Sequence, residues 1–555
     1  MSLIRKQAGI VVLAMILCSF SGVTLHAMTE SVHQALIQLG DSDRAVRRQA
    51  REVLMKEGDA SIVPILEAFN VGLLENRQGS LVIYAPRVQT SQQKREYPLR
   101  DALTGKPLLD AKGQQLYAER LAPSMMHALH ADRGAISTLI KALSIQHPDP
   151  EKRISAIVAA GDRADVSLLP VLQKQLEAKP EKRIAQAIAE SIACIQMAHG
   201  NKADKIRAAR LLGDNRSARG SSSLRKALQD KTNIDPELKS AIVDALAKID
   251  GYQRWIKLVQ NLFSGLSLGS ILILMALGLA VIFGLMGVIN MAHGEFMMLG
   301  AFTAYVVCEV FKRYLPSSLF NYYFVCAIPA AFIFSACAGW LCEWALIRHL
   351  YGRPLETLLA TWGLSLVLIQ AVRVVFGDTL SLTPPQWLEG SWEVSRDLVL
   401  PINRLFIIGF CAVCTLLFYL IVQKTKLGLL LRSTVQDRET ASSLGVPTRR
   451  VDGLTFALGT GLAGLAGCVI PLYDKINPGM GQGYVVDSFM VVVLGGLGKV
   501  AGVIIGGVGL GFLTKFIEPF LQAVYGKVAV LAMIILFLQW RPSGLFPSKG
   551  RLADE

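Results

Sequence analysis

Long apolar segments fill the second half of the chain, whereas the first half alternates apolar with charged positions. The apolar segments lie at 256–287, 294–311, 322–347, 355–376, 402–423, 451–473, 484–498, 500–518 and 526–540. A helix needs about 20 mainly apolar residues to cross the hydrocarbon core of a bilayer. The pattern therefore predicts an all-α, polytopic membrane region (251–550) of about nine spans, in which the shorter segments are candidates for broken or re-entrant helices.

The first half, residues 28–250, places its apolar residues at the spacing of a helix face. PEKRI occurs at 150–154 and again at 180–184, and an alanine-rich segment follows it each time. Related segments, each with Asp or Pro near a charged first turn that suits a helix start, lie at 41–69, 203–215 and 234–250. This pattern resembles HEAT-type repeats and predicts stacked helical hairpins, a scaffold without catalytic chemistry.

Two segments of this half depart from the helical pattern. Residues 76–118 carry Gly and Pro between short β-prone runs, which predicts an inserted loop or hairpin. Residues 1–27 begin with basic residues, continue with an apolar run and end at Ala27, which predicts a signal peptide cleaved after Ala27. An uncleaved anchor is the alternative, and either would export residues 28–250 across the membrane.

Composition agrees with a membrane protein and weighs against one other class. Of the 555 residues, 52% are hydrophobic and 18% are charged. The mean hydropathy of +0.41 is far above that of an ordinary soluble protein. The formal net charge of +14 is also found in nucleic-acid-binding proteins. Here, however, the basic residues lie in the helical first half or beside apolar segments, where the bias of cytoplasmic loops toward Lys and Arg accounts for them, so no nucleic-acid partner is expected.

Basic clusters between the apolar segments predict the orientation of the chain in the membrane. They are Arg348 with Arg353, residues 423–438, Arg449 with Arg450, and residues 541–551. A chain that starts outside and alternates through nine spans places every one of these clusters in the cytoplasm, as the positive-inside rule requires. We therefore expect a multi-pass membrane protein with an exported N-terminal domain (28–250) and a cytoplasmic C-terminal tail (551–555).

Recognisable catalytic motifs are missing from the sequence. GGLGKV at 495–500 lacks the first Gly and the Ser or Thr of a phosphate-binding loop, and no Ser-His-Asp or HExxH pattern emerges. Cys411 and Cys414 form a CxxC, but it stands inside an apolar run, where small helix-packing residues are the more common reading than a metal or redox pair. The sequence therefore predicts a transport subunit rather than an enzyme, with no cofactor and no metal.

Glycines recur at regular spacing in the last spans. Gly498, Gly502 and Gly506 are four residues apart, as are Gly507 and Gly511. Small residues at this spacing share one helix face and let neighbouring helices approach closely. These five glycines are therefore predicted to pack helices.

Three strongly polar residues interrupt the apolar run GVINMAHGEFMMLGAFTA at 287–304. Asn290, His293 and Glu295 fall with Gly294 where the first span ends and the second begins, which predicts a helix break. Burying a polar group in hydrocarbon is costly unless the group has a partner. Two roles remain open: these residues line a translocation pathway for a polar solute, or they pin the first two helices together through buried hydrogen bonds.

Segments 278–302, 425–467 and 489–507 resemble the signature of the branched-chain amino acid type permeases of ATP-driven importers. Within that family, RPLETLLATWGLSLVLIQ at 353–370, RPSGLFPSKGR at 541–551 and the long exported region are most similar to the permeases of urea importers. The resemblance implies a subunit that forms the translocation pathway for urea, with branched-chain amino acids as the alternative solute. A stand-alone channel or secondary transporter, and a receptor that the membrane half merely anchors, are the competing classes.

The same resemblance implies partners and a place where one of them binds. Permeases of this kind pair with a second permease, two cytoplasmic ATP-binding subunits and a periplasmic solute-binding protein, all at the lipid membrane. The resemblance thus implies the bacterial inner membrane, with residues 28–250 in the periplasm. Residues 428–447 resemble the coupling helix that docks on the ATP-binding subunit, with Arg432, Asp437, Ala441 and Gly445 as its candidate residues. An ordinary solvated loop is the alternative. Asp474 and Asp487, near the outer ends of their segments, are candidates for docking the solute-binding protein or are simply solvated carboxylates.

Overall fold

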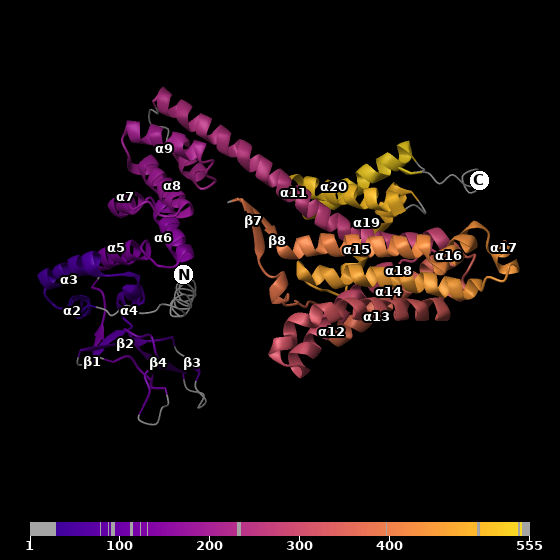
Figure 1. Ribbon diagram of the computed structural model, residues 1–555, viewed down its shortest axis with the longest axis horizontal. Coiled ribbons are helices and arrows are strands. Elements are labelled where there is room, and N and C mark those ends of the chain that lie inside the picture. Colours follow the sequence, from indigo (N-terminus) through magenta and orange to yellow (C-terminus); the bar gives the residue numbers. More distant parts are fainter. Residues whose placement is uncertain are drawn as a thin grey trace. The chain divides into compact units, whose positions relative to one another are not determined.

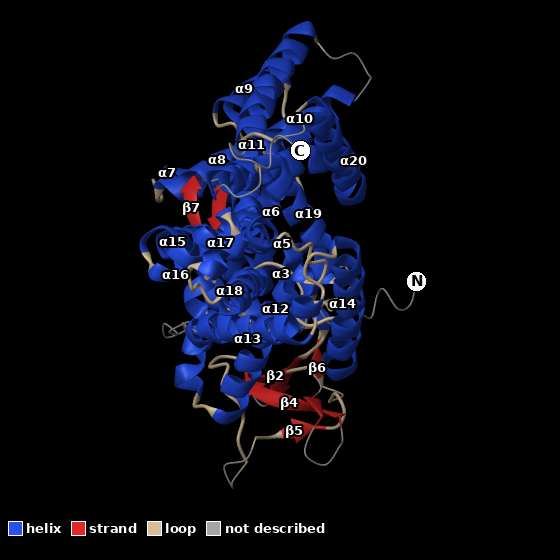
Figure 2. Ribbon diagram, turned by 90° about the vertical axis from the view of Figure 1, so that its right-hand side faces the viewer, coloured by secondary structure: helices blue, strands red, loops and turns tan. Residues whose placement is uncertain are grey.

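The protein consists of two compact units, Met1–Gln253 and Arg254–Glu555. The computed structural model describes residues 29–77, 79–86, 88–89, 95–110, 115–122, 124–129, 131–229, 235–395, 397–496, 500–541 and 544–546. Helices dominate both units, as predicted, and strands occur in two places among the described residues (Figures 1 and 2). The predicted signal peptide (1–27), Gly498 and the tail 551–555 lie outside the described residues.

The N-terminal unit is a series of helices in which each packs on its neighbours in the chain. They are α2 (Glu30–Gln38), α3 (Arg44–Glu57), α4 (Val63–Val71), α5 (Arg133–Ser144), α6 (Pro150–Asp162), α7 (Leu169–Glu177), α8 (Lys182–His199), α9 (Lys202–Asp214), α10 (Gly220–Gln229) and the start of α11 (Pro236–Met286). Side chains of Asp43, Asp149 and Asn201 cap α3, α6 and α9 by accepting hydrogen bonds from the first helical turn.

Three apolar cores follow one another along this unit. The first lies among α2–α5, the second among α5–α8 and the third among α8–α11. Neighbouring cores meet at a shared helix. α5 contributes Leu143 to the first core, and Ile145, just after the end of α5, belongs to the second. α8 contributes Ile188 to the second core and Met197 to the third. Such neighbour-to-neighbour packing is typical of repeat proteins, and the HEAT-type assignment stays a prediction.

An antiparallel sheet stands between α4 and α5. Its strands are β1 (Leu74–Arg77), β2 (Ser80–Tyr84), β3 (Val88–Gln89), β4 (Arg95–Asp101), β5 (Tyr117–Ala118) and β6 (Met125–Met126). The order is β3-β4-β2-β1-β6, and β5 pairs with β4. The predicted insertion, 76–118, is therefore too short, because the strands run from Leu74 to Met126. The segment forms a six-stranded sheet rather than a single loop or hairpin. Both faces of β2 are covered, because Leu81 and Ile83 enter the first helical core while Tyr84 packs with Leu99 in a separate small one.

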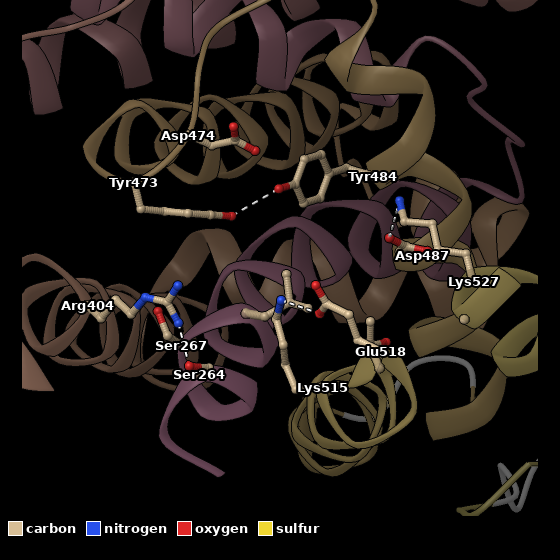
Figure 3. A pocket seen from close by; sticks show the side chains of 13 residues that line it. Ser264, Ser267, Arg404, Tyr473, Asp474, Tyr484, Asp487, Lys515, Glu518 and Lys527 are labelled. Atoms are coloured by element: carbon tan, nitrogen blue, oxygen red, sulfur yellow. Dashed lines mark hydrogen bonds and ion pairs between the residues drawn. The ribbon is translucent and has the colours of Figure 1, made fainter. Parts of the chain in front are cut away.

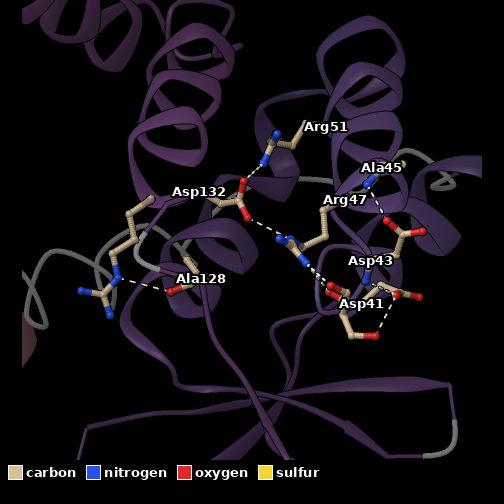
Figure 4. Close-up of polar contacts among 9 residues, drawn as sticks. Asp41, Asp43, Ala45, Arg47, Arg51, Ala128 and Asp132 are labelled. Carbon is tan, nitrogen blue, oxygen red and sulfur yellow. Dashed lines mark hydrogen bonds and ion pairs between the residues drawn. The ribbon is translucent and has the colours of Figure 1, made fainter.

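A buried ion cluster ties α3 to the start of α5 (Figure 4). Arg47 Nε donates to Asp132 Oδ2 at 2.8 Å, and Arg51 donates to the other carboxylate oxygen. Arg47 also donates to the backbone carbonyls of Asp41 and Ser42 at 2.8 and 2.7 Å. Burial alone would raise the pKa of Asp132, but hydrogen bonds from Arg51 and Arg47 outweigh burial, so the pKa lies below its ordinary value.

The second unit is a bundle of apolar helices (Figure 1). After α11 come α12 (His293–Tyr314), α13 (Tyr323–Ala345), α14 (Pro354–Phe376), α15 (Ile402–Lys424), α16 (Lys426–Gln436), α17 (Arg438–Ser443), α18 (Thr448–Val469), α19 (Met480–Gly495) and α20 (Val500–Trp540). Seven helices of the described chain are long and apolar enough to cross a membrane, and two shorter apolar helices, Met480–Gly495 and Tyr525–Trp540, coincide with the remaining predicted spans.

The bundle has two ends with different contents. One end, called here the hairpin end, carries β7 (Ser391–Ser395), β8 (Leu398–Pro401) and the bridge between Leu380 and Ile476. The other, called the α17 end, carries α16, α17 and the loops around 287–292 and 346–353 (Figure 1). The last helix, α20, must double back near Pro519, because both Gly502 and the segment at Gly544 approach the end of α19.

Glycines bring several helices of this unit into backbone contact. A Cβ on Gly467 of α18 would collide with the carbonyl oxygen of Met297 on α12, and one on Gly300 would collide with Gly464. Of the glycines predicted to pack helices, Gly502 abuts Gly495, Gly506 lies near Val491, and Gly507 and Gly511 lie against α11 at Ile273 and Gly265. Close approach of this kind is how membrane helices gain packing contacts.

Candidate functional site

The polar residues of the helix break are all buried, and two of them, His293 and Glu295, bond to neighbouring helices. α11 ends at Met286, and residues 287–292 connect it to α12, whose first residue is His293. Asn290 Oδ1 accepts a hydrogen bond from the backbone N–H of Ala292 at 3.0 Å. His293 Nε2 lies 3.1 Å from the carbonyl oxygen of Met275 in α11, and since a carbonyl only accepts, this nitrogen carries the proton. Gly294 lies against the backbone of Gly481 in α19.

Glu295 reaches a third helix. Ser365 of α14 donates its hydroxyl to Glu295 Oε1 at 2.7 Å, and the backbone N–H of Met291 donates to Thr361 Oγ1 of the same helix at 3.1 Å. Asn290, His293 and Glu295 are 2%, 0% and 1% exposed. The geometry therefore supports the helix-pinning role for His293 and Glu295, which bond to α11 and α14, whereas the bond of Asn290 stays within its own loop.

Each of these three residues nevertheless has a second polar atom that is not hydrogen-bonded to a described residue. Asn290 Nδ2, His293 Nδ1 and Glu295 Oε2 have no hydrogen-bond partner among the described residues. Asn290 also lines a cavity of about 170 Å³ whose other walls, including Phe283 and Phe489, are apolar. A buried polar atom without a partner is the feature that a passing solute or a bound water would satisfy, so the pathway role stays open for Asn290.

Replacing Ser365 with alanine tests which role Glu295 has. If Glu295 pins α12 to α14, losing the hydroxyl should lower the free energy of unfolding of the detergent-solubilised protein by about 1–3 kcal/mol and leave the KM for the transported solute unchanged. Thr303→Ala is the matched control, because its hydroxyl bonds only to Leu299 in its own helix. A changed KM at unchanged stability would instead assign Glu295 to the solute path.

A second cavity, of about 290 Å³, opens at the hairpin end and is lined mainly by residues with polar side chains (Figure 3). Its lining comes from α11, α15, the segment after α18, α19 and α20, and consists of Ser264, Ser267, Leu268, Arg404, Tyr473, Asp474, Tyr484, Asp487, Thr514, Lys515, Glu518, Gly526 and Lys527. Lys515 pairs with Glu518 at 2.6 Å, and Lys527 approaches Asp487 at 3.7 Å. The two tyrosine hydroxyls lie 3.0 Å apart.

Arg404 differs from the other cations of this cavity. It donates to Ser264 Oγ at 2.5 Å and lies over the ring of Tyr473, 6.0 Å from its centroid, but it forms no ion pair with a described residue. Of the charged residues here, only Asp474 and Asp487 were predicted from the sequence. The others also lie within one turn of the outer ends of their apolar segments, and this position was the signal that could have identified them.

The segment predicted to couple to an ATP-binding subunit folds as two short helices at the α17 end. Asp437 caps α17 by accepting from Thr440 N at 2.9 Å, and Ala441 is buried. Gly445 has φ +84°, and with Val446 it closes the helix, the two backbone N–H groups donating to Ser442 and Ala441. Arg432 is exposed and donates to Gln423 at 2.9 Å, while Leu444 is 81% exposed.

Cys411 and Cys414 are both buried free thiols on α15. Within the described part of the chain, no group of three or more His, Cys, Asp or Glu side chains is arranged to hold a metal ion.

Comparisons with known proteins cover the membrane unit. Residues 261–538 match the family model described as branched-chain amino acid transport system / permease component. The chain is 30% identical over 301 residues to the high-affinity branched-chain amino acid transport system permease protein LivH of Salmonella typhimurium, covering 53% of this chain and 96% of the relative. It is 30% identical over 294 residues to BraD of Pseudomonas aeruginosa, covering 52% and 95%.

A more distant relative is the permease protein LivM of Escherichia coli, 24% identical over 308 residues, covering 51% of this chain and 69% of LivM. No solved structure gives a significant match. These relatives are named as permease proteins and not as enzymes, and they match the half of the chain that carries the apolar bundle. The chain belongs to the family of permease components of branched-chain amino acid transport systems.

Proposed function

We propose that this chain is a translocation subunit of an ATP-driven importer, and that its solute is a branched-chain amino acid. The observation that carries the proposal is the family match over 261–538, which spans the apolar bundle and the two cavities described above. The names of the relatives favour the amino acid over urea, the solute that the sequence resemblance put first.

Urea is the second candidate, because two observations favour it. Residues 353–370 and 541–551 resemble urea permeases, and the family match, 261–538, does not include the N-terminal helical unit. Urea is neutral and polar, and it would need hydrogen-bond donors and acceptors along its path. The unpartnered Asn290 Nδ2 is one such donor.

The proposed orientation places the hairpin end outside and the α17 end in the cytoplasm. Basic residues at the α17 end, where the positive-inside rule expects them, are Arg348, Arg353, Arg432, Arg438, Arg449 and Arg450. α17 then faces the ATP-binding subunits, with Leu444 as an exposed apolar contact beside it. The hairpin end then faces a periplasmic solute-binding protein, and the N-terminal unit is periplasmic. A second permease completes the pathway.

The test of the proposed function is uptake of labelled leucine and labelled urea, side by side, in source cells with and without this gene. Solute concentrations are kept low so that passive entry of urea is small. Loss of leucine uptake alone supports the amino acid proposal, and loss of urea uptake alone replaces it with the second candidate. Unchanged uptake of both solutes contradicts both candidates.

Arg404→Gln gives a sharper prediction for the polar cavity. If the solute is an amino acid that enters there, we expect its carboxylate to contact Arg404. This arginine of the lining has no ion-pair partner among the described residues. Losing a hydrogen bond to a charged group then raises KM about tenfold or more. A neutral solute such as urea has no carboxylate to lose, so its KM should change less than about twofold.

Arg373→Gln is the control for this cationic position. Arg373 lies at the hairpin end and pairs with Asp378 at 3.0 Å, but it is not part of the cavity lining. The KM for uptake by the Arg373→Gln variant should equal that of the unmodified protein. Leucine uptake with an unchanged KM in Arg404→Gln would remove this cavity from the pathway of the amino acid.

A further inference from the structure

A polar network lies beneath α17, and the proposed function does not explain it. Arg438, the first residue of α17, contacts both carboxylate oxygens of Asp452, which belongs to the first turns of α18. The carboxylate side chain of Asp452 is 3% exposed, so its charge depends on Arg438 for compensation. The guanidinium of Arg438 also lies over the ring of Tyr351, 5.0 Å from its centroid.

The network continues from Tyr351 into a third helix. Tyr351 donates its hydroxyl to Glu343 Oε1 at 3.0 Å, and Glu343 stands near the end of α13 with its side chain 1% exposed. Arg348 approaches the other carboxylate oxygen at 3.6 Å. The side chain of Arg438 therefore connects α17 to α18 directly and to α13 through Tyr351.

α13 and α18 form a tightly packed pair. A Cβ on Gly339 of α13 would collide with Thr460 of α18, and one on Gly461 of α18 would lie 2.6 Å from the ring of Phe332. Gly464 lies equally close to Ser335, with a Cβ 2.5 Å from the Cβ of that serine. Helices packed this closely cannot shift independently without large repacking, so a force applied at Asp452 moves both.

Among the described residues, α17 makes few other side-chain contacts with the bundle, of which the buried Ala441 is one. Its residues from Glu439 to Ser443 are exposed apart from Ala441. Asp437 caps the helix from within its own segment, and Gly445 and Val446 close it the same way. The long side chain of Arg438 is thus the polar link by which this exposed helix reaches the buried helix pair.

We propose that Arg438 transmits movement of α17 to the α13–α18 pair, and that breaking its pair with Asp452 uncouples ATP hydrolysis from solute transport. This inference rests on the proposed function, because it takes α17 to be the helix that docks on an ATP-binding subunit. In these terms Arg438 is a positioning residue: it touches neither solute nor nucleotide, and it acts through Asp452.

The experiment uses the whole importer, purified from its source cells through a tag on this chain and reconstituted in lipid vesicles. ATP hydrolysis and uptake of labelled leucine and labelled urea are measured together. In the double variant R438Q/D452N, which leaves no unpaired buried charge, we expect ATP hydrolysis within twofold of the unmodified importer and uptake at least tenfold lower. The charge exchange R438D/D452R should recover a large part of that uptake.

R373Q/D378N is the matched control, since it removes an exposed arginine–aspartate pair, 3.0 Å apart, at the hairpin end. It should keep both activities. An unchanged ratio of uptake to hydrolysis in R438Q/D452N would overturn the inference, and so would loss of hydrolysis together with uptake, because that result assigns Arg438 to docking rather than transmission. If the unmodified importer shows no ATP-dependent uptake of either solute, the proposed function fails first, and the inference fails with it.

Discussion

Replacing Gly467 with leucine is expected to reduce the yield of folded protein at least tenfold. A Cβ at this position of α18 has no space, because it would overlap the backbone carbonyl of Met297 on α12. A flexible side chain can turn away from an added atom, but here α12 itself would have to move, together with Gly300 and its close contact to Gly464. Overpacking costs about 1–3 kcal/mol even where side chains can adjust, so a backbone collision should exceed that range.

Gly363→Leu is the control for this prediction. Gly363 lies in the middle of α14, another membrane-spanning helix, and a Cβ there would meet no atom within 4 Å. Both variants carry the same substitution in an apolar helix, so they differ only in the space available. Size-exclusion profiles and thermal stability in detergent provide the measurement. Equal yields of folded Gly467→Leu and Gly363→Leu would show that α12 and α18 are not in backbone contact.

Asp132→Asn should destabilise the N-terminal unit by about 3–5 kcal/mol, because it leaves two arginines without their carboxylate. Arg47 is only 7% exposed, and its remaining bonds are to the carbonyls of Asp41 and Ser42. The measurement is hydrogen exchange of peptides from α3 and α5 in the full-length protein. Glu52→Gln is the control, since the Glu52 pair with Arg48 is exposed and should contribute less than about 1 kcal/mol.

The same carboxylate predicts how this unit responds to acid. The pKa of Asp132 lies below its ordinary value when folded, so its stabilising effect is fully present above the unfolded pKa, about 3.9. The effect is lost as the pH falls through the lower folded pKa. Protection of α3 and α5 should therefore decrease below about pH 4 in the unmodified protein, and this component of the decrease should be missing in Asp132→Asn. An identical acid response in both would contradict the role of Asp132.

Hydropathy predicted the membrane helices well because a span is defined by its own residues. Each of the nine apolar segments overlaps a helix of the described chain, although some extend past the end of their helix and 500–518 and 526–540 belong to the single helix α20. The sheet was underestimated for the opposite reason. β6 is only two residues long and pairs with β1 across almost fifty residues of chain, so no local pattern marks it.

The candidate site shows the same limit. Asn290, His293 and Glu295 could be identified from sequence, because polar residues inside an apolar run are conspicuous. Their partners could not, since Ser365 and Met275 belong to other helices and carry no distinguishing neighbours. Arg404 and Lys515 line one cavity from helices more than a hundred residues apart, and only the fold brings them together.

The bond between Glu295 and Ser365 also bears on how the chain enters the membrane. The two residues are 70 positions apart, so the ribosome completes α12 well before α14 exists. α12 has the lowest hydropathy of the seven long apolar helices, 1.4, and a carboxyl group in its first turn. Until α14 emerges, that carboxyl has no serine to bond with, and full burial in lipid would be unfavourable. We therefore expect the final placement of α12 to await the synthesis of a later helix, so that the order of folding differs from the order of translation.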